Sequence, residues 1–520
     1  MKKLFNLRFI FVYFLLVIFG ITVSRMVSCY SSLDTVILIV LVFASVNLLV
    51  FSLVCARKYA KLLLNITVSF VIFIMAITSG LILASSLNKD FESLSNDNYA
   101  ISGEIQKVNY QDGVVYLKDV VIDKLDYKMR GEVKIYWYDE TVSDKIVRGD
   151  KLSLSCYLVL RDGNDRFVGS SQTAVGYVSD KGSVEITESK SLKDKFKRSV
   201  WDKLCSVNDN KSVSEIEFAM LFGDKDHMSD DTKSVYSVTG LAHILAVSGL
   251  HVGFVVSIIY TLVKRILKYR HWLTLLVTSI FIVAYLYLCD FAISAVRAVL
   301  MTIVIYYAKA RGKQYDALCG LSLAGILILV ASPFDLFDVG LQLSFSVVFS
   351  LFALSPPIGG WLKKFMPEKL ANALSVCLAT FIGSILIIAY YFNNCSTLAI
   401  LSNLIIIPVV SIAFTMLFLT VILSTIFPFL KFLIAIPSVL FECINVVVYS
   451  ISELKISALL FSTNIIGVLL GFVVVFILSD YVFLTKKQKA VVVGVLVCFI
   501  GMTVVHSNYR ILEEMSEVLV

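Results

Sequence analysis

Three polar side chains that could do acid–base or ligand chemistry lie close together in an otherwise apolar stretch, residues 240–253. His243, Ser248 and His251 are set among Leu, Ala, Val and Gly in the run Gly-Leu-Ala-His-Ile-Leu-Ala-Val-Ser-Gly-Leu-His-Val-Gly. Ionisable groups inside a membrane-length apolar segment are costly and usually line a path, form a site or contact another helix. On a continuous helix Ser248 would lie about 140° and His251 about 80° from His243. We therefore expect Gly249 to loosen the helix, so that the three side chains converge.

Catalytic interpretations of these residues are weak. A serine hydrolase needs a positioned base, an orienting acid and an oxyanion hole, and the Gly-x-Ser-x-Gly elbow is absent around Ser248. Two histidines eight residues apart make a poor metal site without a fixed third ligand. The sequence also has no Gly-x-x-x-x-Gly-Lys-Ser/Thr nucleotide loop. We predict no catalytic residue, no metal and no cofactor, and assign His243, Ser248 and His251 to a polar pathway or a packing cluster.

A second polar site is expected around Arg297, which lies inside an apolar stretch. An arginine at the centre of a membrane helix costs roughly 2.5–3.5 kcal/mol, and less near an interface. It must pair, extend to the interface or face water, and the candidate partners are Asp290, Asp335 and Asp338. Two interpretations stay open: an ion pair that only fixes helix packing, and a positive lining for a passing phosphate chain.

Uncharged polar side chains occur in the later apolar stretches at Gln342, Ser344 and Asn403. Hydrogen bonds between helices explain such residues more often than a pore does, at about 0.6 kcal/mol each. Pro408 predicts a break or a kink close to Asn403, which suits a site or a constriction. We include Gln342 and Asn403 among the candidate pathway or gate residues.

The composition indicates a polytopic α-helical membrane protein. Of 520 residues, 58% are hydrophobic and 16% charged, against about a quarter charged in soluble proteins. We predict roughly 11–13 membrane segments, the first three near residues 9–28, 35–55 and 62–86. Lysines and arginines gather in alternate loops, which places the N-terminus in the cytoplasm and the C-terminus outside the plasma membrane. The net charge of +7 arises largely in these loops and is poor evidence for nucleic-acid binding.

Residues 98–190 differ chemically from the rest and predict a small extracytoplasmic β-domain. Val133–Tyr138 and Leu152–Leu160 alternate between two faces, and turn residues separate such runs. The segment has 13 lysines and arginines against 15 aspartates and glutamates, so it offers no basic face for nucleic acid. Tyr136, Trp137 and Tyr138 are candidates for stacking on nucleobases, although aromatic residues in strands more often belong to a core.

Residues 191–212 form a basic amphipathic pattern. Leu192, Phe196, Val200 and Leu204 recur every four residues among lysines, which predicts a helix on the membrane surface; a positive collar at a pore mouth is the alternative. We divide the chain into N-terminal membrane helices, the β-domain, amphipathic surface helices, a transmembrane domain and a short external tail, at 1–90, 98–190, 191–238, 239–508 and 509–520.

The cysteines predict no metal site, because none of the ten forms a Cys-x-x-Cys pair. Cys156 is the only cysteine of the β-domain segment, so an internal disulfide is excluded there. A bridge from Cys156 to Cys205 is an alternative outside the cytoplasm, and isolated apolar cysteines are the preferred interpretation.

Four stretches resemble the ComEC competence family, the DNA-internalisation channels of naturally transformable bacteria. The first, Ala242–Gly253, is highly specific. The others would be weak alone but follow in the family's order: Ser294–Met301, Asp338–Phe345 and Asn403–Pro408. Together the resemblance extends over residues 1–510.

The resemblance implies an OB-like barrel in the β-domain and a channel for single-stranded DNA across the cytoplasmic membrane during natural transformation. Many members carry an external metallo-β-lactamase-like domain with an inferred nuclease role; we expect none after the short tail, and no enzyme activity. The expected partners are single-stranded DNA, membrane lipid and a separate DNA receptor, nuclease and ATP-driven motor, with a homo-oligomer left open. The alternatives are a transporter of a small anionic or lipid-like solute and a membrane scaffold.

Overall fold

The structure is a computed structural model, and it describes most of the chain after residue 96. The described residues are 9–30, 97–109, 113–123, 127–129, 132–136, 149–160, 172–187, 191–268, 270–454, 458–479, 482 and 484–518. The spans predicted near residues 35–55 and 62–86 lie outside these ranges. The chain splits into two compact units. The barrel unit is Phe9–Ser199 with Ser322–Asp338, and the membrane unit is Met1–Arg8, Val200–Leu321 and Val339–Val520.

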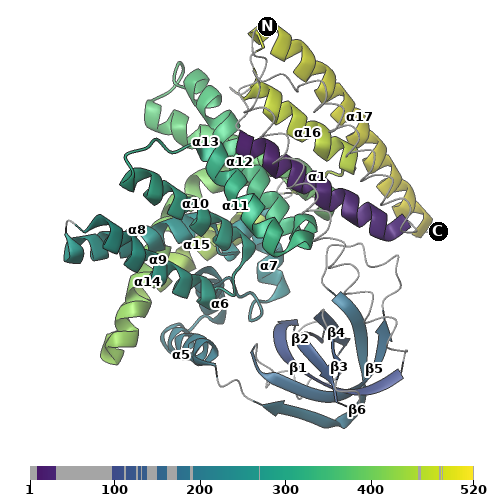
Figure 1. Ribbon diagram of the computed structural model, residues 1–520, viewed down its shortest axis with the longest axis vertical. Helices are drawn as coiled ribbons and strands as arrows, with labels where there is room; N and C mark the ends of the chain where they lie inside the picture. The colour runs from purple at the N-terminus through teal and green to yellow at the C-terminus, as the bar shows by residue number, and fades with distance from the viewer. Residues whose placement is uncertain are drawn as a thin grey trace, which may run out of the picture. The chain divides into compact units, whose positions relative to one another are not determined.

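The barrel unit holds a closed β-barrel, which confirms the predicted β-domain (Figure 1). Its strands are β1 (Asp97–Asn109), β2 (Val114–Ile122), β3 (Tyr127–Lys128), β4 (Glu132–Tyr136), β5 (Lys151–Leu160) and β6 (Gln172–Thr187). The order β1-β5-β6-β4-β2 returns to β1, because β1 pairs with both β5 and β2. Of these ladders β4–β6 is parallel and the others are antiparallel. The same unit contains α1 (Phe9–Tyr30), where the first span was expected.

Alternation along each strand gives the barrel its core. On β4, Val133 and Ile135 are buried, while Glu132, Lys134 and Tyr136, which alternate with them, are half-buried. Cys156 on β5 is fully buried in the same core and is a free thiol. Cys205 is also free, so the alternative of a Cys156–Cys205 bridge is wrong, and the apolar interpretation of Cys156 is confirmed.

A buried ion pair joins the barrel to the first half of the predicted surface helix, α5 (Leu192–Val207). Arg198 Nη2 donates to Asp150 Oδ1, and the Asp150 side chain is almost fully buried. Asp194 in the first turn of α5 lies against Gly149, where any Cβ would overlap its carboxylate. Gly149 has a φ of +91°, which favours glycine. The start of α5 is therefore fixed to the barrel by charge and by close packing.

Replacing Asp150 by alanine should destabilise the barrel unit by about 2 kcal/mol, since it leaves a partly buried guanidinium without its carboxylate. The matched control is Lys128→Ala, which breaks an exposed pair with Asp119 and should cost less than about 1 kcal/mol. Both losses of stability can be measured by heating the purified full chain and using protease cleavage within residues 97–199 to report unfolding of the barrel unit. Equal losses for the two variants would contradict the structural role given to Asp150.

The membrane unit is a helical bundle. After α5 come α6 (Lys211–Phe222), α7 (Asp230–Val238), η3 (Ala242–Leu245), α8 (Gly249–Leu267), α9 (His271–Leu288) and α10 (Ile293–Ala310). The next elements are α11 (Ala317–Ala331) and η4 (Pro333–Phe337), which fall largely in the barrel unit, then α12 (Val339–Leu362) and α13 (Glu368–Phe392). The last are β7 (Asn394–Ser396), α14 (Ala399–Ile426), η5 (Pro428–Ile434), α15 (Ala435–Ser452), β8 (Ala458–Leu460), α16 (Ile465–Leu478) and α17 (Lys486–Val518).

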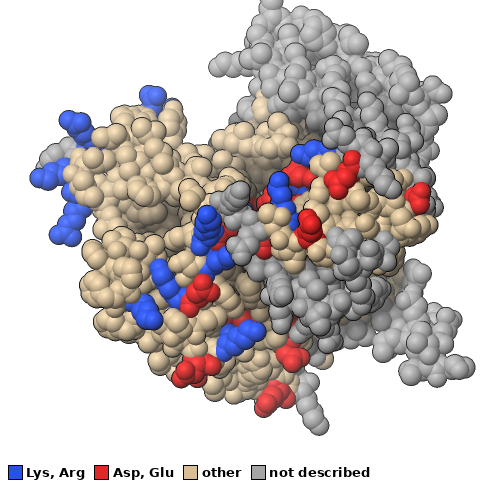
Figure 2. All heavy atoms as spheres, turned by 90° about the horizontal axis from the view of Figure 1, so that it is seen from below, with Lys and Arg blue, Asp and Glu red and all other residues tan. Residues whose placement is uncertain are grey.

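Six helices in the described part of the chain are long and apolar enough to cross a membrane. They begin at Gly249, Val339, Glu368, Ala399, Pro428 and Lys487. Large apolar side chains such as Ile426 and Val505 are exposed on them, as lipid-facing surfaces require. In Figure 2 one group of Lys and Arg side chains lies at an edge of a largely uncharged surface, and other Lys and Arg side chains lie among Asp and Glu over the middle of the same face. The chain is a polytopic helical membrane protein with an inserted barrel, as predicted.

Small residues hold α12 and α13 together. Ser346 Oγ donates to the carbonyl of Gly383, and a Cβ at Gly383 would come within 2.6 Å of Ser350 Oγ. Without a hydrophobic driving force inside lipid, such close backbone approach and interhelical hydrogen bonds stabilise helix pairs. This tight pair fixes α12, whose first turns contact the candidate site.

Candidate functional site

The stretch around the two histidines folds as two elements, not as one span from residue 240. Gly240 has a φ of +77° and ends α7, and η3 carries His243. Ser248 is the N-cap of α8, with an extended backbone, so the helix begins at Gly249. No continuous helix carries all three polar residues, because Gly240 and Ser248 adopt non-helical conformations. The break does bring the polar residues near one another.

His251 is the centre of this arrangement. It is buried in the first turn of α8, and the Ser248 backbone N–H donates to its Nδ1 at 3.2 Å. An accepting Nδ1 leaves the ring proton on Nε2. The ring packs against Phe414 of α14, with centroids 4.5 Å apart. His243 is exposed and lies near enough to His251 for the two rings to interact electrostatically.

Arg297 lies beside the start of α8. Its guanidinium is buried, and Nη1 donates to the Ser344 carbonyl of α12 at 2.6 Å. A Cβ at Gly249 would be 3.6 Å from its Nη2, and its Nε has no hydrogen-bond partner among the described residues. The centre of the Phe345 ring lies 5.9 Å from Arg297 Cζ. Among the described residues of the membrane unit no ion pair joins Arg297 to a carboxylate, so the suggested pairing with Asp290 is not formed.

Asn403 and Gln342 differ in their surroundings. Asn403 lies one helical turn after Ala399, the residue of α14 that packs against Gly240, so both share one face of α14. Its Oδ1 is buried and has no hydrogen-bond partner among the described residues. Gln342 Oε1 accepts from the Tyr391 hydroxyl at 3.2 Å, which joins α12 to α13. The structure therefore places Asn403 one turn beyond the contact between Ala399 and Gly240, and gives Gln342 a packing contact.

Of the break or kink predicted at Pro408, the break is absent. α14 runs without interruption from Ala399 to Ile426, with Pro408 inside it. Pro408 has no N–H to donate to the carbonyl four residues earlier, but neighbouring helices support the segment. A constriction built on a broken helix at this position is therefore wrong.

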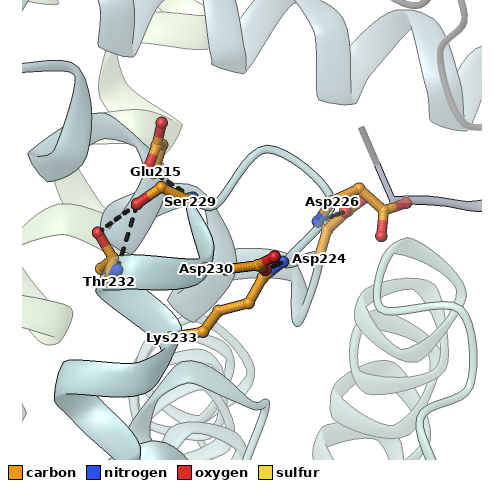
Figure 3. Close-up of polar contacts among 7 residues, drawn as sticks. All are labelled: Glu215, Asp224, Asp226, Ser229, Asp230, Thr232 and Lys233. Atoms are coloured by element: carbon orange, nitrogen blue, oxygen red, sulfur yellow. Dashed lines mark hydrogen bonds and ion pairs between the residues drawn. The ribbon is translucent and has the colours of Figure 1, made fainter. Parts of the chain in front are cut away.

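A polar turn that the sequence did not point to leads into the site (Figure 3). Ser229 caps α7, with Oγ accepting from the Thr232 N–H at 3.2 Å, and its own N–H donates to Glu215 Oε2 at 3.3 Å. Lys233 pairs with Asp230 at 2.9 Å in the same turn. These contacts fix the connection between α6 and α7. Ser229 followed by two aspartates is an N-cap signal that could have located this helix start.

Glu217 on α6 is a buried carboxyl that sequence reasoning missed. Ser438 Oγ of α15 lies 2.7 Å from its Oε1, and Asn208 Nδ2 donates to its Oε2 at 2.8 Å. Ser438 Oγ also lies 2.9 Å from the Ile434 carbonyl. An ionised Glu217 would have to share the one hydroxyl proton of Ser438 with the Ile434 carbonyl, whereas a protonated Glu217 would donate to Ser438 and leave that proton to the carbonyl. Burial raises the pKa of Glu217 to about 7, against these two hydrogen bonds, which lower it.

The aromatic cluster of the barrel is only partly described. Tyr136 ends β4 and is half-buried, while Trp137 and Tyr138 lie outside the described residues. The Tyr136 ring stacks on Tyr177 of β6, with centroids 5.4 Å apart and planes 9° apart. Tyr177 escaped sequence reasoning because its strand pairing with Tyr136 is not local. In the described part of the chain no group of three or more His, Cys, Asp or Glu side chains is arranged to hold a metal ion.

Comparisons with known proteins agree with this arrangement. The family model described as Competence protein matches residues 220–485, just over half of the chain, and this segment contains the histidine turn, Arg297, Gln342 and Asn403. The chain is 32% identical to ComE operon protein 3 of Bacillus subtilis over 194 residues, 36% of this chain and 24% of that protein. It is 26% identical to Recombination protein 2 of Haemophilus influenzae over 185 residues, 34% of this chain and 22% of that protein.

A third relative is an uncharacterized protein of Aquifex aeolicus, 31% identical over 201 residues, which are 38% of this chain and 44% of the relative. The matched segments thus span less than half the length of these curated relatives. No solved structure matches the chain. Because the family model covers just over half of the sequence, this chain belongs to the Competence protein family, of the ComEC type.

Proposed function

We propose that this chain conducts single-stranded DNA across the cytoplasmic membrane during natural transformation. Membership of the Competence protein family supports a role in DNA uptake. The observation that carries the conducting role is Arg297, a buried guanidinium bonded to a single backbone carbonyl and lying beside the first turn of α8. Arg297 lies within residues 220–485, the segment that matches the family model, so the matched segment itself contains this buried positive charge.

Arg297 acts as a gate residue in this proposal. The buried guanidinium lies between the start of α8 and the Ser344 carbonyl of α12, and we take this arrangement as the closed state of the proposed gate. A buried cation without a paired anion is costly, and a phosphodiester reaching it when the helices separate would supply that anion. In the proposal His243, His251 and Asn403 supply further polar groups along the path. Ser248 fixes the helix start, and Gln342 supports the gate through α12.

The energy for transport must come from another protein. Each phosphate that moves into a negative interior works against about 2.3 kcal/mol per 100 mV if it crosses the full potential. The sequence has no nucleotide-binding loop. We propose a separate cytoplasmic motor, with a DNA receptor and a nuclease outside, and place the barrel and the C-terminus on the outer side by the distribution of basic loops.

The test is entry of labelled DNA into a deletion strain that carries the gene back on a plasmid. The wild-type gene should restore entry, and Arg297→Ala should lower it by about 100-fold at normal protein level, the scale expected for a lost charge contact of roughly 3 kcal/mol. Arg297→Lys should be intermediate, since it keeps the charge but not the planar donor array. Arg311→Ala is the control, because Arg311 follows the same helix and packs over Trp272 and Tyr307.

Two outcomes would contradict the proposal at different levels. Normal entry in the deletion strain would rule out the conducting role and favour a transporter of another solute. Restored entry with Arg297→Ala, at a protein level equal to wild type, would remove Arg297 from the gate while leaving the channel in place.

A further inference from the structure

Three tyrosines form a row across neighbouring strands on the outer surface of the barrel. Tyr136 of β4 pairs in register with Tyr177 of β6, and Tyr177 pairs with Tyr157 of β5. Residues in register point to the same side of a sheet, and neighbouring strands are about 4.8 Å apart. Tyr177 and Tyr157 are each 41% exposed, so the barrel leaves much of both rings uncovered. We call Tyr136, Tyr177 and Tyr157 the tyrosine row.

The core of the barrel does not need these rings. The inward positions on the same strands are filled by Ile135, Cys156, Leu158 and Gly176. A Cβ at Gly176 would come within 2.5 Å of Ile135, so the interior is already full at this level. Large aromatic side chains kept on the outer face of a barrel, in register over three strands, therefore call for a ligand.

Lysines accompany the aromatic rings. Lys134 Nζ donates to the Tyr136 hydroxyl at 2.6 Å and lies 4.3 Å from the centre of its ring. One step along the barrel, Lys134 pairs in register with Tyr116, and Tyr116 with Lys107, whose Nζ lies 5.6 Å from the Tyr116 ring. Stacking rings with a few amino groups beside them match a chain of planar bases joined by phosphates.

The charge of the domain selects among possible ligands. Residues 98–190 carry 13 lysines and arginines against 15 aspartates and glutamates. Duplex DNA and anionic membranes are held mainly by neutralised phosphates, which this surface cannot supply in number. A single strand exposes the faces of its bases, and stacking on aromatic rings works without a basic face. The aromatic content and the scarcity of cations together favour single-stranded over double-stranded nucleic acid.

We propose that the tyrosine row, with Lys134, binds unpaired bases of single-stranded DNA by stacking. The inference rests on the proposed function, because it identifies where the barrel holds the strand that the membrane unit would conduct. Lys134 and Lys107 would contact two phosphates. The logarithm of the DNA association constant should therefore fall with the logarithm of the salt concentration at a slope of roughly −1.4, since each phosphate contact on a single strand contributes about −0.7.

The test measures binding of a fluorescein-labelled oligo(dT) of about 12 nucleotides, a length within the site sizes of OB barrels, to the full chain in phosphatidylcholine nanodiscs. Tyr157→Val and Tyr177→Val keep strand propensity but remove the ring; each should weaken binding about tenfold and the pair about a hundredfold, as loss of one stacked base predicts. Tyr177→Trp, which keeps an aromatic ring at this position, should bind the oligomer about as well as wild type. An abasic oligomer of equal length and a duplex should both bind poorly.

Binding by the double variant within about twofold of wild type would overturn the inference, and so would equal binding of the abasic oligomer. A loss of binding to phosphatidylglycerol vesicles in the double variant, with oligo(dT) binding unchanged, would assign the row to lipid headgroups instead. Failure of the inference is separable from failure of the proposed function. If the tyrosine row binds no DNA while deletion of the gene still abolishes DNA entry, only the inference fails; if the row binds and deletion has no effect, only the function fails.

Discussion

Replacing Gly240 by alanine should destabilise the membrane unit by about 4 kcal/mol, through a strained backbone and an overpacked contact together. Gly240 has a φ of +77°, where an L-residue is strained. Its Cβ would also come within 2.5 Å of Ala399 Cβ and 3.0 Å of Ala399 Cα at the start of α14. Neither contact can be relieved by a rotamer change, because one atom is backbone and the other is fixed to it. The purified variant should therefore unfold at a clearly lower temperature in detergent, and less of it should reach the membrane.

Two other glycines separate the strain from the clash. Gly312 has a φ of +63° with no heavy atom within 4 Å of its would-be Cβ, so Gly312→Ala tests strain alone and should cost about 1 kcal/mol. Gly253 lies in α8 with no positive φ and no such neighbour, so Gly253→Ala should be neutral or slightly stabilising. If Gly240→Ala costs no more than Gly312→Ala, then α14 does not pack against Gly240 as described.

Glu217 should make the folded protein less stable as the pH rises from about 5 to 8, and Glu217→Gln should remove most of this dependence. Burial raises the pKa of Glu217 to about 7 in the folded protein, from 4.5 in the unfolded chain. A raised folded pKa contributes stability that is full below the unfolded value and is lost as the pH rises through the folded one. A shift of this size corresponds to about 3 kcal/mol between the two limits.

The hydrogen-bond geometry supports the protonated form. Ser438 has one hydroxyl proton and two acceptors, the Ile434 carbonyl and Glu217 Oε1. A protonated Glu217 would donate to Ser438 and free the hydroxyl for the carbonyl. Ionisation would place a negative charge at a site where the described residues offer it two polar groups, Ser438 and Asn208. The expected result of raising the pH is a looser contact between α6 and α15.

Thermal unfolding of wild type and Glu217→Gln, measured from pH 5 to 8 in one detergent, tests this prediction. Glu368→Gln is the control: Glu368 is exposed, and its hydrogen bond from Lys363 lowers its pKa, so its loss cannot remove a transition near pH 7. A wild-type stability that is flat over this range would show that the pKa of Glu217 is not raised in the folded protein, and a slope that persists in Glu217→Gln would assign the pH dependence to another group.

Much of the architecture could be predicted from local pattern. Alternation in Val133–Tyr138 and Leu152–Leu160 located β4 and β5, because side chains on a strand point to opposite faces in turn. The four-residue recurrence after residue 191 located α5 in the same way. The apolar composition indicated a membrane bundle, and the isolated charge of Arg297 marked a buried polar position before any contact was known. Each of these follows from the period of one element or from the cost of polarity in lipid.

The contacts that define the candidate sites could not be predicted in this way. Ser438 meets Glu217 from 221 residues away, Tyr136, Tyr177 and Tyr157 come into register only when the barrel closes, and Ala399 reaches Gly240 through the packing of α14. Pro408 predicted a break or a kink, and α14 is not broken there. Periodicity tells which face of a segment is apolar, but it carries no information on which distant segment covers that face. That choice depends on the packing of all elements at once, since every buried polar group and every small residue must find its partner in the same arrangement.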